Sequence, residues 1–324
     1  MLTEFNIIEK YFTRPSRNTD LSVGDDAARS QISAGHQLVV SVDMSVSGTH
    51  FLADCPAYFV GWKSLAVNIS DIAAMGARPK WVTLAIALPN INEAWLADFS
   101  RGFFACADAF NVSLIGGDTT SGPLNISVQI MGEVPIGKAL RRDGAKLGDE
   151  IWVSGTLGEA ALGLAQLQNK LTEDTLSEAE KEICIDALQA PQPRICLGLA
   201  LQDIANSAID ISDGLLADLG HILEHSTLGA NLYWEKIPRV HVSNGLDNAK
   251  LQSLCLAGGD DYELCFTAPA SNHDVILAIG KKQHIKLSVI GETTRVPAHK
   301  NRLNVYDKNH QALELKTTGY DHFN

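Results

Sequence analysis

The sequence predicts a mixed α/β (α+β) protein that is built from two domains. The chain has 324 residues, which is more than one hydrophobic core usually serves. Segments with strand composition alternate with segments that carry a helical apolar stripe. Residues 137–149 form a polar, charged and glycine-rich stretch, which is typical of a domain boundary. We therefore expect an N-terminal domain at 1–140 and a C-terminal α/β domain at 141–324.

The expected elements follow in order along the chain. The opening residues have an amphipathic helical pattern. In the rest of the first half, strands are expected at 37–46, 80–88, 112–120 and 124–134, and helices at 56–77 and 91–110, the last of these capped by Asn92. In the second half, strands are expected at 150–155, 207–212, 230–234, 262–268 and 286–294, and helices at 159–168, 214–226 and 273–282.

Composition argues against several classes of protein. No apolar run reaches the roughly 18 residues that span a bilayer, so no membrane association is expected. The start of the chain is acidic and lacks the basic flank of a signal peptide, which favours a cytoplasmic location. The 6 cysteines include no CxxC pair, so neither a structural zinc site nor a disulfide framework is favoured. The net charge of −12 argues against a protein that mainly grips nucleic acid.

The positions of the aspartates are the most informative pattern in the sequence. Several follow glycines or lie inside apolar segments: Asp25, Asp26, Asp43, Asp71, Asp118, Asp210, Asp213, Asp260 and Asp261. Asp43 stands in an apolar strand, and Asp71 stands on an otherwise apolar helix. An unpaired carboxylate is costly to bury in such places, and most of these positions have no neighbouring Lys or Arg in the sequence.

Two interpretations remain open for these acids. Asp-Gly and Gly-Asp pairs are common in turns and at helix caps, and Asp118 and Asp213 fit such roles. Asp43 and Asp71 do not lie in turn composition. Carboxylates at strand ends beside glycines also suit a magnesium site, because Mg²⁺ prefers carboxylate oxygens and acts together with substrate phosphates. Clustered carboxylates would repel one another without such a cation.

Phosphate-binding motifs are weak in this chain. Residues Gly132–Ala139 nearly match a Walker A loop, but Ala139 replaces the hydroxyl residue that binds magnesium, and a proline interrupts the loop. The turn Gly155–Gly158 could present helix N-terminal amides to an anion, although an ordinary strand-to-helix turn is favoured. A nucleotide would then be held through metals and isolated cations, for which Arg141 and Arg142 are candidates.

Two further motifs do not indicate a site. His221 and His225 stand four residues apart on the helix expected at 214–226, but no third zinc ligand is evident, so ordinary histidines are favoured. No serine lies in the GxSxG elbow of a hydrolase nucleophile.

Eight segments together resemble the thiamine-monophosphate kinase family, within the superfamily of aminoimidazole ribonucleotide synthetase (PurM). They extend over nearly the whole chain and occur in the family's order. They are VGDDAA (23–28), SVDMSVSGTHF (41–51), LAVNISDIAAMGARP (65–79), LIGGDTTSGP (114–123), GKALRRDGAKLGD (137–149), NSAIDISDGLLADLGHI (206–222), AGGDDYELCFT (257–267) and GYDHF (319–323). Selenophosphate synthetase, another member, would need a reactive Cys or selenocysteine near the N-terminus, and residues 1–24 contain no Cys.

The resemblance implies transfer of the γ-phosphoryl group of ATP to thiamine monophosphate, with several Mg²⁺ ions. The implied magnesium ligands are Asp26, Ser41, Val42, Asp43, Asp71, Asp118, Asp210 and Asp213. The implied nucleotide contacts are Gly117, Asp118, Arg142 and Ser212, and the implied substrate contacts are His50, Asp260 and Tyr320. Asp260 departs from the family, which often has Glu at this position, so its carboxylate is one methylene closer to the backbone.

The implied chemistry needs no general base, and none is evident. The acceptor is a phosphate oxygen whose second pKa is about 6, so it is already largely ionised near neutral pH. Magnesium ions held by aspartates would bring the two polyanions together. The resemblance also implies a PurM-like fold whose N-terminal domain dimerises by pairing β-sheets. Two alternatives stay open, namely another ATP-using PurM-like synthetase and a non-catalytic nucleotide- or metal-binding regulator.

Overall fold

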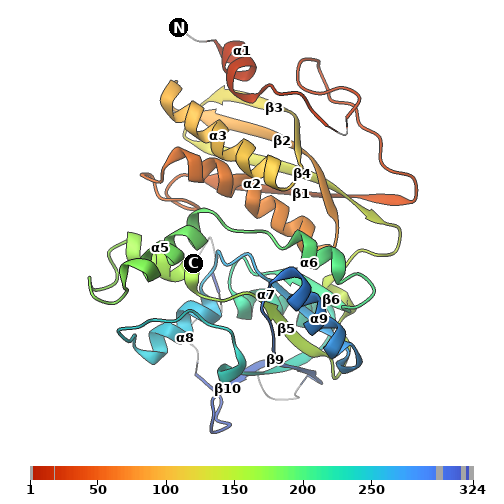
Figure 1. The fold of residues 1–324 in the computed structure, drawn as a ribbon, viewed down its shortest axis with the longest axis vertical. Coiled ribbons are helices and arrows are strands. Elements are labelled where there is room, and N and C mark those ends of the chain that lie inside the picture. The colour runs from red at the N-terminus through yellow and green to blue at the C-terminus, as the bar shows by residue number, and fades with distance from the viewer. Residues whose placement is uncertain (1–2, 18, 297–301, 315–318, 321–324) are drawn as a thin grey trace. The chain divides into compact units, whose positions relative to one another are not determined.

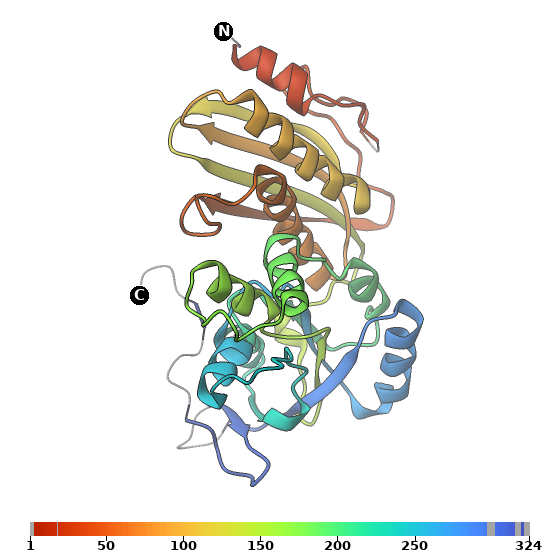
Figure 2. The same ribbon diagram turned by 60° about the vertical axis from the view of Figure 1, so that its left-hand side comes forward.

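The computed structural model of the chain describes residues 3–17, 19–296, 302–314 and 319–320. The chain divides into two compact units (Figures 1 and 2). Unit 1 comprises Met1–Ile72 and Ala77–Gly137, and unit 2 comprises Ala73–Gly76 and Lys138–Asn324. Each unit has its own β-sheet with helices packed on it, so the predicted mixed α/β composition is confirmed. No helix in the described ranges is long and apolar enough to cross a bilayer.

Unit 1 is built on a four-stranded sheet with the order β1-β4-β2-β3. Its strands are β1 (His36–Val46), β2 (Arg78–Leu88), β3 (Ser113–Ser121) and β4 (Asn125–Pro135). β4 runs antiparallel to both neighbours, and β2 runs parallel to β3. The helices α2 (Ala57–Ala74) and α3 (Glu93–Ala109) lie on one face of this sheet (Figure 2). The N-terminal segment forms α1 (Glu4–Ile7) and a short π-helix (Ile8–Phe12), and the Phe12 ring packs edge-on against Phe99 of α3 at 6.3 Å.

The covered face of this sheet is apolar because alternate residues of each strand point toward the helices. Ile126, Val128 and Ile130 of β4 are fully or almost fully buried.

Glycines let the two helices α2 and α3 approach closely. A Cβ atom on Gly61 of α2 would lie 2.1 Å from a carbonyl oxygen of α3, and one on Gly102 of α3 would lie 1.8 Å from a carbonyl oxygen of α2. The backbones of α2 and α3 therefore touch where these glycines face each other.

The other face of β1 carries an exposed apolar row. Leu38, Val40, Val42 and Met44 are 44%, 50%, 61% and 54% exposed. Their strand neighbours Ser41 and Asp43 point to the covered face, where they are paired in register with Ile130 and Val128 of β4. β1 therefore presents polar side chains toward the helices and apolar side chains away from them, which reverses the usual pattern of a surface strand.

Unit 2 is built on a six-stranded sheet with the order β10-β7-β9-β5-β8-β6. Its strands are β5 (Glu150–Ser154), β6 (Ser207–Asp210), β7 (Gly229–Tyr233), β8 (Leu264–Ala268), β9 (Leu287–Thr294) and β10 (Leu303–Tyr306). Its α-helices are α4 (Glu159–Leu167), α5 (Glu178–Gln189), α6 (Ile195–Ala200), α7 (Leu215–His225), α8 (Asn248–Ala257) and α9 (His273–Gln283). Short 3₁₀ turns lie at Arg142–Gly144, Trp234–Lys236 and Ala270–Asn272.

The core of unit 2 lies on both faces of the central strands. Trp152 of β5 and Phe266 of β8 are fully buried and stack with ring centroids 6.1 Å apart. Some elements of unit 2 differ from expectation. A strand was expected from residue 262, but β8 begins at Leu264, because Asp260 and Tyr262 adopt left-handed backbone conformations with φ of +71° and +49°. Helix α8 was not expected from the sequence.

Candidate functional site

Polar side chains of unit 1 meet where β1 faces α2. The Ser41 hydroxyl donates a hydrogen bond of 2.5 Å to Oδ2 of Asp71. Burial, together with the negative charge of Asp71, raises the pKa of Asp43 to about 7. The structure therefore brings three of the predicted magnesium ligands together, and the two carboxylates disfavour each other's charge. A hard cation would relieve that repulsion.

Asp118 lies elsewhere in unit 1. It belongs to β3, and its register partner Ala85 on β2 points to the face that the helices leave open. β1 and β3 form opposite edges of the sheet, so Asp118 and Asp43 are separated across it. The preceding Gly117 has φ of +153°, and a Cβ atom there would lie 1.8 Å from the carbonyl oxygen of Leu84. Only glycine fits this position of β3, which explains Gly117 without a ligand.

Three other predicted residues of unit 1 lie outside the group of Ser41, Asp43 and Asp71. Asp26 is exposed in the loop before β1, and its N–H donates to the Asp25 carboxylate at 2.9 Å, which is turn chemistry. The Val42 side chain belongs to the exposed apolar row, so Val42 could bind a metal only through its main chain. His50 follows β1, and its Nδ1 accepts the N–H of Val46 at 3.1 Å. A neutral His50 therefore carries its proton on Nε2.

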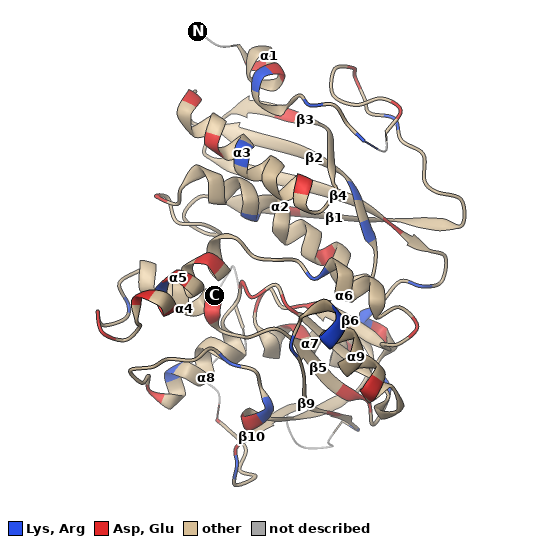
Figure 3. Ribbon diagram, in the orientation of Figure 1, with Lys and Arg blue, Asp and Glu red and all other residues tan. Residues whose placement is uncertain are grey.

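In unit 2, a loop with three predicted residues joins β6 to α7. Asp210 ends β6, and Ser212 and Asp213 follow it. Figure 3 shows the acidic segments of the loops that lie beside α7. Gly214, not Asp213, is the N-cap of α7, so the helix-cap interpretation that was open for Asp213 is wrong. No side chain caps the first turn of α7, but a residue within the helix, which sequence reasoning missed, holds the loop before it.

That missed residue is Asp218. Its Oδ2 accepts the N–H groups of Ser212, Asp213 and Gly214 at 3.0, 3.0 and 3.1 Å. Burial and the charge of Asp213 raise the pKa of Asp218 to about 7, while the three N–H groups act in the opposite direction. Its sequence signal was similar to that of Asp71, an acid inside an apolar stretch, here LLADL at 215–219. Asp218 holds the loop in which the predicted ligand Asp213 and the predicted nucleotide contact Ser212 lie.

Two further segments join the same loop through the main chain. The N–H of Asp260 donates to the carbonyl oxygen of Ser212 at 2.8 Å, and the N–H of Tyr320 donates to that of Asp213 at 3.0 Å. The structure thus brings Ser212, Asp213, Asp260 and Tyr320 together, although they are far apart in the sequence. Tyr320 is 51% exposed. The remainder of the GYDHF motif, residues 321–323, lies outside the described residues.

Arg142 does not join this group through its main chain. Its carbonyl oxygen accepts the hydroxyl of Ser226 at 3.0 Å, and Ser226 is the C-cap of α7. The loop with Ser212 precedes the opposite end of the same helix. The neighbouring Arg141 forms an ion pair with Asp143 at 2.5 Å, so its charge is already partly compensated.

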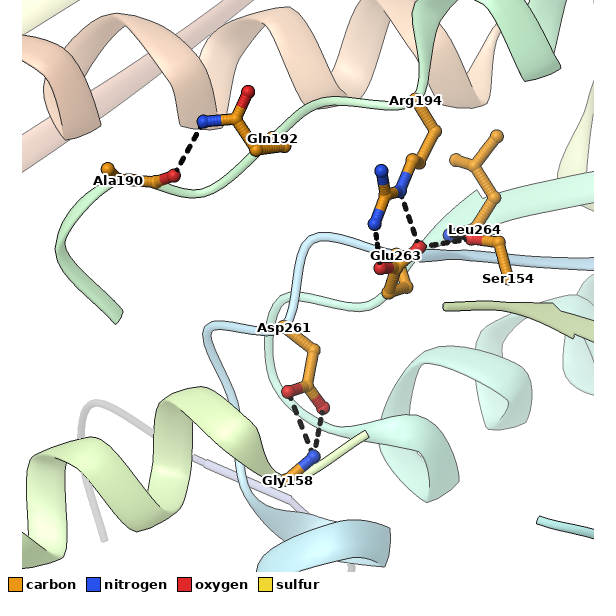
Figure 4. Close-up of polar contacts among 8 residues, drawn as sticks. All are labelled: Ser154, Gly158, Ala190, Gln192, Arg194, Asp261, Glu263 and Leu264. Atoms are coloured by element: carbon orange, nitrogen blue, oxygen red, sulfur yellow. Dashed lines mark hydrogen bonds and ion pairs between the residues drawn. The ribbon is translucent and has the colours of Figure 1, made fainter. Parts of the chain in front are cut away.

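A network of buried polar groups supports the segment after Asp260 (Figure 4). Glu263 forms an ion pair with Arg194, in which Nε of Arg194 lies 2.7 Å from Oε2, and it also accepts the hydroxyl of Ser154. The Asp261 carboxylate accepts the N–H of Gly158 at 3.0 and 3.2 Å. Burial raises the pKa of Asp261 well above its usual range, against the effect of the Gly158 N–H. The amide at the start of α4 is therefore occupied by the protein's own carboxylate, which supports the ordinary-turn interpretation of Gly155–Gly158.

Two disfavoured motifs are explained by their surroundings. Gly132 lies inside β4, so the segment that resembles a Walker A loop begins in a paired strand. His221 and His225 are exposed on α7, and Nδ1 of His225 lies 2.8 Å from the carbonyl oxygen of His221.

Within the described ranges, no three His, Cys, Asp or Glu side chains are grouped so that they could hold a metal ion by themselves. The set of magnesium ligands therefore stays a prediction.

Comparison with known proteins agrees with the expected fold and family. The family model described as AIR synthase related protein, N-terminal domain, matches residues 24–134, and the corresponding C-terminal domain model matches residues 146–303. Thiamine-monophosphate kinase of Escherichia coli (strain K12) is 43% identical over 99% of this chain and 98% of its own length.

Two solved structures extend the comparison. The crystal structure of thiamine-monophosphate kinase from Stenotrophomonas maltophilia K279a has a TM-score of 0.83 and 44% identity, covering 95% of this chain and 96% of that one. AaThiL complexed with AMPPCP and TMP has a TM-score of 0.73 and 28% identity, covering 93% of this chain and 92% of that one. Sequence and fold agree over nearly the whole length, and the chain belongs to the thiamine-monophosphate kinase family of the AIR synthase related proteins.

Proposed function

We propose that this chain transfers the γ-phosphoryl group of ATP to thiamine monophosphate, producing thiamine diphosphate and ADP. The observation that carries the proposal is the 43% identity to a thiamine-monophosphate kinase over 99% of the chain. A more distant relative, at 28% identity and TM-score 0.73, is described in complex with AMPPCP and TMP. Both units have acid-rich loops, which offer the carboxylates that a magnesium-dependent transfer from ATP would need.

We assign magnesium binding to oxygen atoms that match the family's ligand positions: Asp26, Ser41, the main chain of Val42, Asp43, Asp71, Asp118, Asp210 and Asp213. The group formed by Ser41, Asp43 and Asp71 fits a hard divalent cation, because it offers hydroxyl and carboxylate oxygens and its carboxylates repel one another. Bound magnesium would neutralise phosphate charge and orient the phosphates for in-line attack.

The remaining assignments concern the two substrates. Gly117, Asp118, Arg142 and Ser212 are proposed to contact ATP. His50, Asp260 and Tyr320 are proposed to contact thiamine monophosphate. A neutral His50 with its proton on Nε2 suits the phosphate. The Asp260 carboxylate suits the cationic thiamine part, since it would repel the phosphate. No residue is assigned as a general base, because the attacking phosphate oxygen is already ionised.

One assay separates this proposal from its alternatives. ADP release in the presence of magnesium should depend on thiamine monophosphate and be absent with thiamine alone. A PurM-like synthetase would leave thiamine monophosphate unchanged, and a non-catalytic regulator would bind ATP without releasing ADP. Either result would refute the assignment.

We also propose that two copies of the chain pair through the open face of the unit 1 sheet, and that the enzyme acts in the cytoplasm. The exposed row of Leu38, Val40, Val42 and Met44 supports the pairing, because such a row on an edge strand is normally covered. Asp118 points to the same open face. Val42→Lys should shift the protein from dimer to monomer in sedimentation analysis, whereas Ile183→Lys, at an exposed position on α5, should not. A monomeric native protein would refute the pairing.

A further inference from the structure

Backbone and side-chain contacts of residues 260–263 hold Asp260 in place. Asp260 and Tyr262 both have left-handed backbone conformations, with φ of +71° and +49°. Such conformations cost energy for residues other than glycine and persist only where the surroundings impose them. The N–H of Asp260 donates to the carbonyl oxygen of Ser212 and the N–H of Tyr262 to that of Ile211, both at 2.8 Å. The strained segment is thus attached at two points to the loop after β6.

Asp261 and Glu263, the other residues of the same segment, attach it to the interior of unit 2. The carboxylate of Asp261 binds the N–H of Gly158, and Glu263 binds Arg194 and Ser154 (Figure 4). The side chains of Asp260 and Tyr262 also contact each other. The Tyr262 hydroxyl donates a hydrogen bond of 3.1 Å to Oδ1 of Asp260.

We propose that Tyr262 is a positioning residue for thiamine monophosphate, and that it acts by orienting the carboxylate of Asp260. The inference rests on the proposed function, in which Asp260 contacts the substrate. Tyr262 itself need not touch the substrate. Its hydroxyl restricts the rotamer of Asp260, so less conformational freedom is lost when the substrate binds. Binding of thiamine monophosphate should therefore depend on this hydroxyl, while transfer of the phosphoryl group should not.

The test replaces Tyr262 by Phe, which removes the hydroxyl and keeps both the ring and the backbone requirement. Freeing the rotamer of one side chain predicts a KM for thiamine monophosphate about two- to tenfold higher. The kcat should stay within about twofold, because the lost interaction is made equally in the ground state and the transition state. The KM for ATP should be unchanged. The matched control is Tyr233→Phe, which removes a Tyr-to-carboxylate hydrogen bond of 2.8 Å to Glu292 in the β-sheet and should leave all three constants unchanged.

A double-mutant cycle distinguishes positioning from a general structural role. Asp260→Asn should raise the KM by itself, and adding Tyr262→Phe should raise it little further, because Tyr262 acts through the carboxylate. An unchanged KM in Tyr262→Phe would overturn the inference, and so would full additivity of the two substitutions. A similar rise of KM in Tyr233→Phe would assign the effect to stability instead. If the wild-type protein does not phosphorylate thiamine monophosphate, the proposed function itself fails, which is a separate and visible outcome.

Discussion

Replacing Asp43 by Asn should stabilise the magnesium-free protein and abolish its kinase activity. Asn has nearly the same shape as Asp but carries no charge. In the native structure Asp43 is largely buried on β1 beside Asp71, and its pKa is raised from 3.8 to about 7. The charged form of Asp43 is therefore disfavoured by folding, and the substitution removes that penalty.

The magnitude follows from the pKa. Each pH unit of difference between the folded and unfolded pKa corresponds to about 1.4 kcal/mol, so a rise from 3.8 to about 7 corresponds to at most about 4 kcal/mol. Solvent near the partly exposed side chain reduces this figure, and we expect about 2–4 kcal/mol at about pH 8. Because the folded pKa is the higher one, stability is fully present below about pH 4 and is lost as the pH rises toward about 7.

Urea denaturation in the presence of EDTA measures the effect. The stability difference between Asp43→Asn and wild type should grow by about 2 kcal/mol between about pH 5.5 and about pH 8. Magnesium should then stabilise the wild type, by about 2.7 kcal/mol at a concentration 100 times its dissociation constant, and should stabilise the variant much less. Asp174→Asn, at an exposed position in unit 2, is the control and should show neither effect.

Three outcomes would contradict this reasoning. A stability difference that does not change with pH would show that Asp43 is not desolvated beside Asp71. Equal stabilisation of both proteins by magnesium would remove Asp43 from the metal site. Near-wild-type turnover in Asp43→Asn would do the same, independently of stability.

Three further predictions concern other parts of the molecule. Gly117→Ala should destabilise the protein by about 2–4 kcal/mol in thermal or urea unfolding, because Gly117 has φ of +153° and a Cβ atom there would collide with a carbonyl oxygen. The control is Gly116→Ala, whose Cβ atom would meet its nearest neighbour at 3.9 Å and which should cost less than about 1 kcal/mol. Arg194→Met should lower the free energy of unfolding in urea by about 3–5 kcal/mol, because it leaves Glu263 buried without its counter-charge. Adding Glu263→Gln should recover part of that stability. If it recovers none, packing and not charge is responsible. Transfer from ATP that is chirally labelled at the γ-phosphorus should proceed with inversion, as a single in-line step requires, and retention would indicate a phosphoenzyme.

Local signals predicted the elements of the chain well. The strand expected at 37–46 is β1, His36–Val46, and the helix expected at 91–110 is α3, Glu93–Ala109. The cap of that helix is also confirmed, since the side chain of Asn92 accepts the N–H of Trp95 at 3.1 Å. These features depend on a few neighbouring residues, so periodicity and capping chemistry were sufficient.

The order of the strands could not be predicted from local signals. That β1 and β3 lie at opposite edges depends on pairings with β4 and β2, which are remote in the sequence. As a result, the sequence could not show that Asp43 and Asp118 point to opposite faces of the sheet. Alternation along a strand tells which residues share a face but not which face the helices cover.

The segment at Asp260–Tyr262 shows how tertiary contacts override local preference. Tyrosine favours strands, and the apolar run after it predicted a strand from residue 262. Hydrogen bonds from the backbones of Asp260 and Tyr262 to the loop after β6 impose left-handed conformations instead. Only the fold brings that loop near, so no pattern within the segment could have indicated it.

The pairing of β1 with β4 also sets the order of events during synthesis. All eleven residues of β1 pair with β4, from His36 with Pro135 to Val46 with Asn125. At about 5–20 residues per second, the ribosome needs roughly 5–20 s to deliver β4 after β1 has emerged. Throughout that interval β1 is an unpaired strand with an apolar row, which is a template for aggregation. A holdase chaperone that covers β1 during this interval should therefore raise the yield of folded protein.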